Sequence, residues 1–246
     1  MQIIPLSEGS FTVDNTKQFV PFEENVDDLQ KRSKGSLLVE IQPFVVITSR
    51  DVLLLDTGLG FSKNGSLQIH QNLKKAGIAP EQITRVLLTH LHKDHAGGVS
   101  FGKNKEQLSF PNATYHVQQR ELEFAVQKGF PSFIIEDFQV LENSNQVQFL
   151  NNDRGTINDY VSYEVTAAHS KFHQVFWIKE SNETIFFGGD DAPQLQQMKI
   201  RYKTKYDYNP EKAMKLRQQW WVQANKEGWS LLFYHDTKTP VSFKPH

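Results

Sequence analysis

Three histidines and an aspartate lie within one short segment of the chain. Residues 89 to 98 read Thr-His-Leu-His-Lys-Asp-His-Ala-Gly-Gly, which places His90, His92, Asp94 and His95 directly after an apolar run. Neutral imidazole is the commonest protein ligand for zinc and similar ions, and a carboxylate at this density suggests room for a second ion. We interpret the segment as part of a metal site; the alternative is a histidine-rich surface loop.

The backbone around this cluster predicts how its side chains divide between two ions. In an extended segment, side chains two residues apart point the same way, so His90 and His92 can converge on one ion. Asp94 and His95 are neighbours and can share a direction only if the chain turns, which the Gly97-Gly98 pair allows. They could then address a second ion close to the first.

Composition limits the kind of protein this chain can be. Its 246 residues hold 27 Lys+Arg against 28 Asp+Glu and no Cys. The balanced charge indicates neither a nucleic acid nor a membrane surface as partner, and the lack of cysteine restricts metal ligands to nitrogen and oxygen.

With 38% hydrophobic residues, we expect one domain over residues 1–246. The N-terminal residues lack the pattern of a signal peptide, so we expect a cytoplasmic protein.

Strand and helix patterns alternate along the chain and predict an α/β fold. Helices are expected over residues 66–77, around 122–129, and from Pro210, capped by Asn209, to just before Gly228. Strands are expected over residues 37–47, 51–55, 83–89, 114–117, 146–150, 160–166, 174–178, 184–187 and 229–234. Residues 14–36 are polar and are expected to form an ordered excursion.

The pattern His-x-His-x-Asp-His resembles the metallo-β-lactamase superfamily. The later landmarks of that family occur in order, with His169 in Ala-His-Ser, Asp190 in Gly-Gly-Asp and His235 in Tyr-His-Asp. The resemblance implies a four-layer αββα sandwich, of α/β (α+β) class, that holds metal ions at one edge. The implied ligands are His90, His92 and His169 for the first ion, Asp94, His95 and His235 for the second, and Asp190 as a bridge between them.

The same resemblance implies a chemistry. Two divalent ions, zinc or else Mn2+ or Fe2+, would activate a bridging hydroxide against a lactone, ester, thioester or amide of a small molecule. Asp94 or Asp190 could carry the proton to the leaving group. Asp56, in Leu-Asp-Thr-Gly, matches a carboxylate that supports the metal loop in the family. A plain strand-end turn is an equally good interpretation of Asp56.

Several positions depart from the family pattern. Phe172 replaces a glycine in His169-Ser-Lys-Phe-His173, so the local turn can differ from that of the family, although His169 and His173 keep their spacing. His173 is expected to pack beside the site and not to bind metal. Lys171 could anchor an acidic substrate group, although a solvated lysine is the plainer interpretation. The homoserine-lactonase branch has a tyrosine three residues after the bridging aspartate, where this chain has Pro193.

Two other functions are consistent with part of this ligand pattern. A mononuclear iron oxidoreductase of the persulfide-dioxygenase type is the alternative, and a nuclease or phosphodiesterase is less consistent with the balanced charge. His70, His116 and His246 lack the spacing of ligands. Aromatic residues at 19, 22, 130, 133 and 138 could wall an apolar pocket or pack in the core. The substrate and the oligomeric state stay open.

Overall fold

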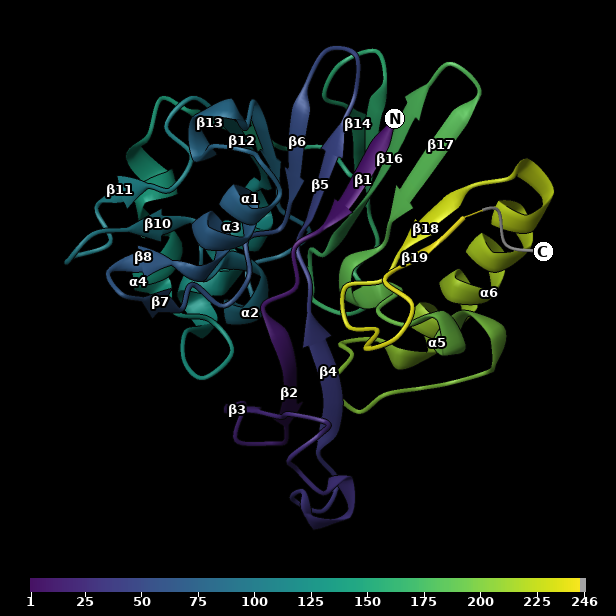
Figure 1. Ribbon diagram of the computed structural model, residues 1–246. Coiled ribbons are helices and arrows are strands. Elements are labelled where there is room, and N and C mark those ends of the chain that lie inside the picture. The colour runs from purple at the N-terminus through teal and green to yellow at the C-terminus, as the bar shows by residue number, and fades with distance from the viewer. Residues whose placement is uncertain (244–246) are drawn as a thin grey trace.

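The computed structural model describes residues 1–243 and contains two six-stranded sheets that face each other (Figure 1). The first sheet has the spatial order β1 (Gln2–Pro5), β5 (Phe44–Ile47), β6 (Val52–Leu55), β9 (Arg85–Leu87), β12 (Thr114–Gln118) and β13 (Val147–Leu150). Strands β6, β9, β12 and β13 run parallel, so their carboxyl ends meet at one edge of the sheet.

The second sheet has the spatial order β14 (Arg154–Thr156), β15 (Val161–Val165), β16 (Gln174–Glu180), β17 (Glu183–Phe187), β18 (Ser230–Leu232) and β19 (Val241–Ser242). β16 and β17 are antiparallel, whereas β17 and β18 are parallel. The start of β16 and the ends of β17 and β18 therefore lie at the same edge.

Short elements complete the fold. The helices are α1 (Gln68–Lys75), α2 (Lys93–Ala96), α3 (Gln119–Lys128), α4 (Ile135–Phe138), α5 (Leu195–Lys199) and α6 (Pro210–Glu227). Turns of 3-10 helix cover Leu29–Lys31, Pro80–Gln82, Gln139–Asn143 and Gly189–Asp191. A three-stranded sheet of β2 (Gly9–Val13), β3 (Phe19–Pro21) and β4 (Leu37–Ile41) extends beyond the sandwich, and two hairpins are formed by β7 (Ser62–Lys63) with β8 (Ser66–Leu67) and by β10 (Ser100–Phe101) with β11 (Gln107–Leu108).

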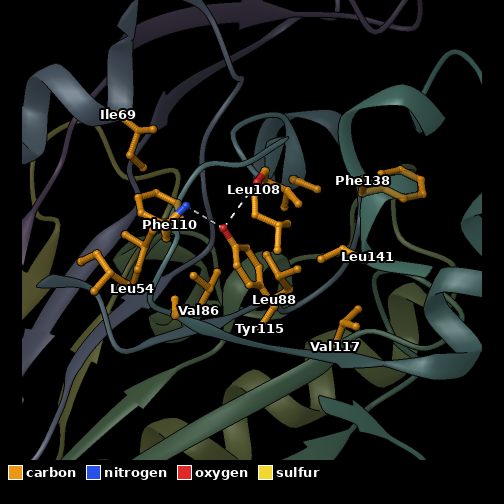
Figure 2. Close-up of a cluster of buried hydrophobic side chains, with 14 of the residues drawn as sticks. Leu54, Ile69, Val86, Leu88, Leu108, Phe110, Tyr115, Val117, Phe138 and Leu141 are labelled. Atoms are coloured by element: carbon orange, nitrogen blue, oxygen red, sulfur yellow. Dashed lines mark hydrogen bonds between the residues drawn. The ribbon is translucent and has the colours of Figure 1, made fainter. Parts of the chain in front are cut away.

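Three apolar cores separate four layers, which confirms the predicted αββα sandwich. One core lies between α1, α3 and the first sheet, a second lies between the two sheets, and a third lies between the second sheet and α6. Figure 2 shows the first of these, where the Tyr115 hydroxyl accepts a hydrogen bond of 2.9 Å from the Phe110 N–H. That bond satisfies the one polar atom of a fully buried ring.

Helix α6 begins and ends as the sequence predicts, but one expected strand is divided. The Asn209 side chain accepts a hydrogen bond from the Lys212 N–H, and Gly228 adopts the left-handed conformation that ends the helix. The strand expected over residues 37–47 breaks at Gln42-Pro43, since proline cannot donate to a sheet ladder. Its two halves, β4 and β5, consequently belong to different sheets.

The polar stretch 14–36 is an ordered excursion, as expected, with β3 and one 3-10 turn inside it. Within residues 1–243, none of the helices combines the length and apolar character needed to cross a bilayer. The cytoplasmic location and the single-domain boundary stay predictions.

Candidate metal centre

The two sheets deliver the predicted ligands to a common edge. His90 follows β9, and Asp56 follows the neighbouring parallel strand β6. In the other sheet His169 precedes β16, Asp190 follows β17, and His235 follows β18. Because β16 runs against β17 and β18, these three positions meet at the edge that faces His90.

The first group of converging side chains is His90, His92, His169 and Asp190, whose ligand atoms all lie within 4.8 Å of one another. His90 Nε2 is 2.9 Å and His169 Nε2 is 3.2 Å from His92 Nδ1. His169 Nε2 is also 3.0 Å from Asp190 Oδ2. His92 thus presents Nδ1 to the cluster, whereas the other two rings present Nε2.

The second group is Asp94, His95 and His235, again with ligand atoms within 4.8 Å of one another. Asp190 reaches this group with its other oxygen, because Oδ1 lies 3.0 Å from His95 Nε2 and 2.9 Å from His235 Nε2. Asp94 Oδ2 lies 3.7 Å from His95 Nε2 and 3.5 Å from His235 Nε2. Asp190 therefore stands between the two groups with one oxygen toward each, and all seven predicted ligands come together.

One buried carboxylate, Asp56, fixes the tautomers of a histidine in each group. Asp56 Oδ2 accepts hydrogen bonds from the Thr89 hydroxyl at 2.7 Å and from His95 Nδ1 at 2.8 Å. The Thr89 hydroxyl has only one proton, which it donates to Asp56. It must therefore accept a hydrogen bond from His90 Nδ1, which lies 3.0 Å from the hydroxyl oxygen. In their neutral forms both rings then turn an unprotonated Nε2 toward the cluster, which is the form that binds metal. Asp56 supports the metal loop, and the plain-turn interpretation is wrong.

The rings of His169 and His235 are oriented in the same way. His169 Nδ1 lies 3.0 Å from Asp207 Oδ1, and His235 Nδ1 donates to the Glu40 carbonyl at 2.7 Å. Asp191, next to the bridging position, accepts from the His169 N–H at 2.8 Å and lies 3.0 Å from His173 Nδ1. His173 packs behind the site, as expected.

The donor set fits metal ions. In the part of the chain that the structure describes, His95 Nε2 and Asp190 Oδ1 are buried and, although 3.0 Å apart, form no hydrogen bond with each other or with another group, whereas buried polar atoms nearly always form one. Burial lowers the pKa of His169, but the Asp190 and Asp207 carboxylates outweigh burial and raise that pKa to about 10. Burial and the neighbouring imidazoles hold the pKa of His90 well below its usual value. The carboxylates thus favour positive charge at the cluster, and imidazole nitrogens together with carboxylate oxygens are the ligand combination that suits zinc and its neighbours.

The turn that separates Asp94 from His92 differs from the expectation. It is the single-turn helix α2, and Gly97 is its helical C-cap with φ of −59°. Gly97 and Gly98 are required for another reason: a Cβ at either position would clash with backbone oxygens of Leu59 or Thr57. The glycines allow α2 to pack closely on the loop after β6.

Glu121 holds the loop in which Phe172 stands where the family has glycine. This buried carboxylate of α3 accepts hydrogen bonds from the Ser170 hydroxyl at 2.5 Å, the Phe172 N–H at 3.3 Å and the Leu91 N–H at 3.3 Å. It ties the loop that carries His169 to the loop that carries His90. Nothing in the sequence around Glu121 marks this role.

The other residues singled out in the sequence lie outside the two groups. His70 bonds the Ser109 carbonyl at 2.9 Å, and His116 is buried beside Arg85; His246 falls outside the described residues. Phe138 is fully buried in the core, whereas the Phe133 ring packs against the His92 ring, with 4.8 Å between the two ring centres.

Two cavities open on the cluster. The first, of about 310 Å³, reaches Asp94, Asp190 and His235 and has mainly apolar walls. These walls include Val13, Phe19, Leu37, Val39, Pro193 and Ile200. The second, of about 290 Å³, lies on the side of His92 and His169 under the loop of residues 129–133. Ligand atoms of the cluster are therefore accessible from two directions.

The sequence profile of the metallo-beta-lactamase superfamily matches residues 41–216. The chain belongs to this superfamily. N-acyl homoserine lactonase AttM of Azorhizobium caulinodans is 31% identical over 120 residues, 44% of this chain and 40% of that protein. An atrochrysone carboxyl ACP thioesterase of Passalora fulva is 49% identical over 57 residues, 23% of this chain and 16% of that protein. The chain thus spans less than half the length of either relative.

Among solved structures, the fold is shared with AidC, a dizinc quorum-quenching lactonase in complex with a product. The TM-score is 0.74 at 20% identity, over 98% of this chain and 89% of that chain. At this identity the likeness concerns the fold. His235 lies beyond the segment that the superfamily profile matches, so its place in the cluster rests on the geometry described above.

Proposed function

We propose that this protein is a metal-dependent hydrolase that cleaves a lactone, ester, thioester or amide of a small molecule at a site for two divalent ions, with zinc as the first candidate. The observation that carries the proposal is the position of Asp190, whose two oxygens face two separate groups of ligands. His90, His92 and His169 would hold one ion, and Asp94, His95 and His235 would hold the other.

Divalent ions at such a site supply Lewis acidity toward a carbonyl oxygen and lower the pKa of water. The protein's own part is to orient the donors and to manage a proton. Both oxygens of Asp190 face ligand nitrogens, whereas Asp94 turns only Oδ2 toward His95 and His235. Asp94 also lines the first cavity. We assign proton transfer to the leaving group to Asp94 in preference to Asp190.

Support for the substrate class comes from the first cavity and from the relatives. Apolar walls beside the cluster suit an acyl chain or a similar apolar group. The relatives named above are a lactonase and a thioesterase. Pro193 lines the cavity and has no group that could donate a hydrogen bond to a substrate, which favours substrates that do not need the lactonase tyrosine.

The test is a panel of N-hexanoyl homoserine lactone, 4-nitrophenyl butyrate, a butyryl thioester, a β-lactam and bis(4-nitrophenyl) phosphate, assayed with zinc- and manganese-loaded protein. We expect turnover of at least one carbonyl substrate and its loss in His90→Ala and Asp190→Ala. His70→Asn, a histidine outside the cluster, is the matched control and should retain activity. One equivalent of iron in protein purified without added metal, together with oxygen consumption on a persulfide, would contradict the proposal.

A further inference from the structure

The second cavity carries a concentration of positive charge that the hydrolase chemistry alone does not use. Lys17, Lys128 and Lys171 all line it, and we call it the lysine cavity. Lys17 comes from the excursion before β3, Lys128 ends α3, and Lys171 follows the ligand His169. Three separate segments of the chain thus bring lysines to the wall of one cavity.

Aromatic rings position these lysines, and no carboxylate neutralises them. Lys128 Nζ lies 5.6 Å and Lys171 Nζ lies 5.8 Å from the centre of the Phe124 ring, and Lys17 Nζ lies 4.4 Å from that of Tyr206. Such contacts hold a cation without cancelling its charge. Within residues 1–243 none of the three lysines forms an ion pair, whereas eight other Lys and Arg residues do.

The one acidic residue on the wall of the lysine cavity is occupied elsewhere. Asp207 Oδ1 lies 3.0 Å from His169 Nδ1, and the Asp207 carboxylate is buried. Like charges gathered around one space repel one another unless an anion enters. The cavity is therefore suited to a negatively charged group of a ligand.

The two cavities meet at the metal cluster. Lys17, Ser132, Tyr206 and the ligands His92 and His169 line both of them. A substrate that crosses the cluster would place one end among apolar side chains and the other among lysines. Its reactive bond would then lie over the cluster, where the first cavity reaches Asp94 and both cavities reach His92 and His169.

We propose that the substrate has two unlike halves, an apolar acyl group in the first cavity and an anionic leaving group, bearing phosphate or carboxylate, in the lysine cavity. This inference rests on the proposed hydrolase function. For a thioester, water adds its oxygen to the acyl carbon, the carbon–sulfur bond breaks, and the sulfur leaves as a thiol after taking a proton. No oxidant or further reactant is needed.

The experiment compares three thioesters that share one hexanoyl group: hexanoyl-coenzyme A with phosphates, S-hexanoylglutathione with carboxylates, and neutral hexanoyl-N-acetylcysteamine. We expect kcat/KM for one or both anionic thioesters to exceed that for the neutral one by about tenfold or more at low salt. Lys17→Gln and the double variant Lys128→Gln/Lys171→Gln should each lower that preference severalfold. The double variant, whose lysines line only the lysine cavity, should leave the neutral thioester unchanged. Lys179→Gln, at the far end of β16, is the charge-matched control.

A binding measurement separates this inference from the proposed function. Calorimetry with desulfo-coenzyme A, which has no thiol to bind metal, should show binding that the double variant weakens and Lys179→Gln does not. If no thioester is hydrolysed but this binding pattern holds, the hydrolase proposal fails for thioesters and the lysine cavity stands. If the three thioesters react equally well and the lysine variants behave as wild type, the lysine-cavity proposal is overturned. Preference for the coenzyme A or the glutathione thioester identifies phosphate or carboxylate as the anion.

Discussion

Asp56→Asn should weaken metal binding at both groups of ligands, although Asp56 lies in neither. Asparagine has the same shape and can keep one acceptor for the Thr89 N–H, which now donates to Asp56 Oδ1 at 2.8 Å. The amide nitrogen would replace Oδ2, which accepts from both the Thr89 hydroxyl and His95 Nδ1. The amide N–H groups would then face two other donors, the Thr89 hydroxyl and His95 Nδ1. The imidazoles of His90 and His95 could relieve this conflict by carrying their proton on Nε2 instead of Nδ1.

The magnitude follows from the bonds that are lost. A buried hydrogen bond to a charged group contributes roughly 1.5–3 kcal/mol, and about 1.4 kcal/mol corresponds to a tenfold change in an equilibrium constant. Loss of the His95 bond should therefore weaken binding at the group of Asp94, His95 and His235 by about 10- to 100-fold. The effect on the group of His90 should be smaller, because Asp56 reaches that ring through Thr89.

The assay is zinc affinity measured by competition with a fluorescent chelator, with two sites fitted separately, together with circular dichroism to establish that the variant is folded. Asp51→Asn is a useful control, because Asp51 lies at the start of β6 and its carboxylate contacts Thr84, Arg85 and Tyr160 away from the cluster. Unchanged affinity at both sites in folded Asp56→Asn protein would refute the relay through Thr89. Equal weakening by Asp51→Asn would show a general loss of stability.

Three further predictions concern single residues. Burial raises the pKa of Glu8 from 4.5 to about 8; the folded state therefore retains this proton longer than the unfolded state, and stability should fall by roughly 3–5 kcal/mol as pH rises from 4.5 through 8. Urea unfolding at pH 5, 7 and 9 should show a smaller fall in Glu8→Gln, and identical pH slopes would contradict this. Gly98→Ala should destabilise the protein by at least about 2 kcal/mol in urea unfolding, because its Cβ would clash with the Thr57 carbonyl; an unchanged midpoint would show that the loop can yield. Asp207→Asn should weaken zinc at the His169 group about tenfold or more and spare the His95 group, and equal losses at both would contradict the pairing with His169.

The sequence predicts the candidate metal ligands better than it predicts the residues that orient those ligands. Imidazoles such as His90 and His95 stand out because few other roles place them so densely after a buried strand. Asp207 bonds a ring that lies 38 positions earlier, and no local pattern connects the two. Glu121 likewise looks like any acidic residue in the first turn of a helix. Long-range hydrogen bonds of common residue types leave no periodicity in the sequence, so only the folded chain reveals them.

Secondary structure shows the same division. Helix α6 is set by local chemistry at Asn209, Pro210 and Gly228, and its limits match the prediction. The strand at 37–47 divides because β4 pairs with β2 and β5 pairs with β1. Pro43 is compatible with a break at this point, but the local sequence does not specify which distant strands the two halves pair with. The family resemblance predicts the four-layer architecture, whereas the alternation of strands and helices predicts an α/β fold only in general terms.

The neighbouring residues Asp190 and Asp191 have identical side chains, but the fold places their carboxylates in different surroundings. Gly189, with φ of +49°, begins the 3-10 turn that carries both, and its lack of a Cβ lets it lie against Thr89 and His173. Asp190 then faces the cluster, while Asp191 faces the opposite way and accepts bonds from the Thr166 hydroxyl and the His169 N–H. The Arg217 guanidinium of α6 bonds the Asp191 carbonyl at 3.0 Å and so ties this turn to the outer helical layer. The position of the Asp190 carboxylate is therefore determined by contacts from both sheets and from α6, and a change in any of these layers should move Asp190 relative to both groups of candidate ligands at once.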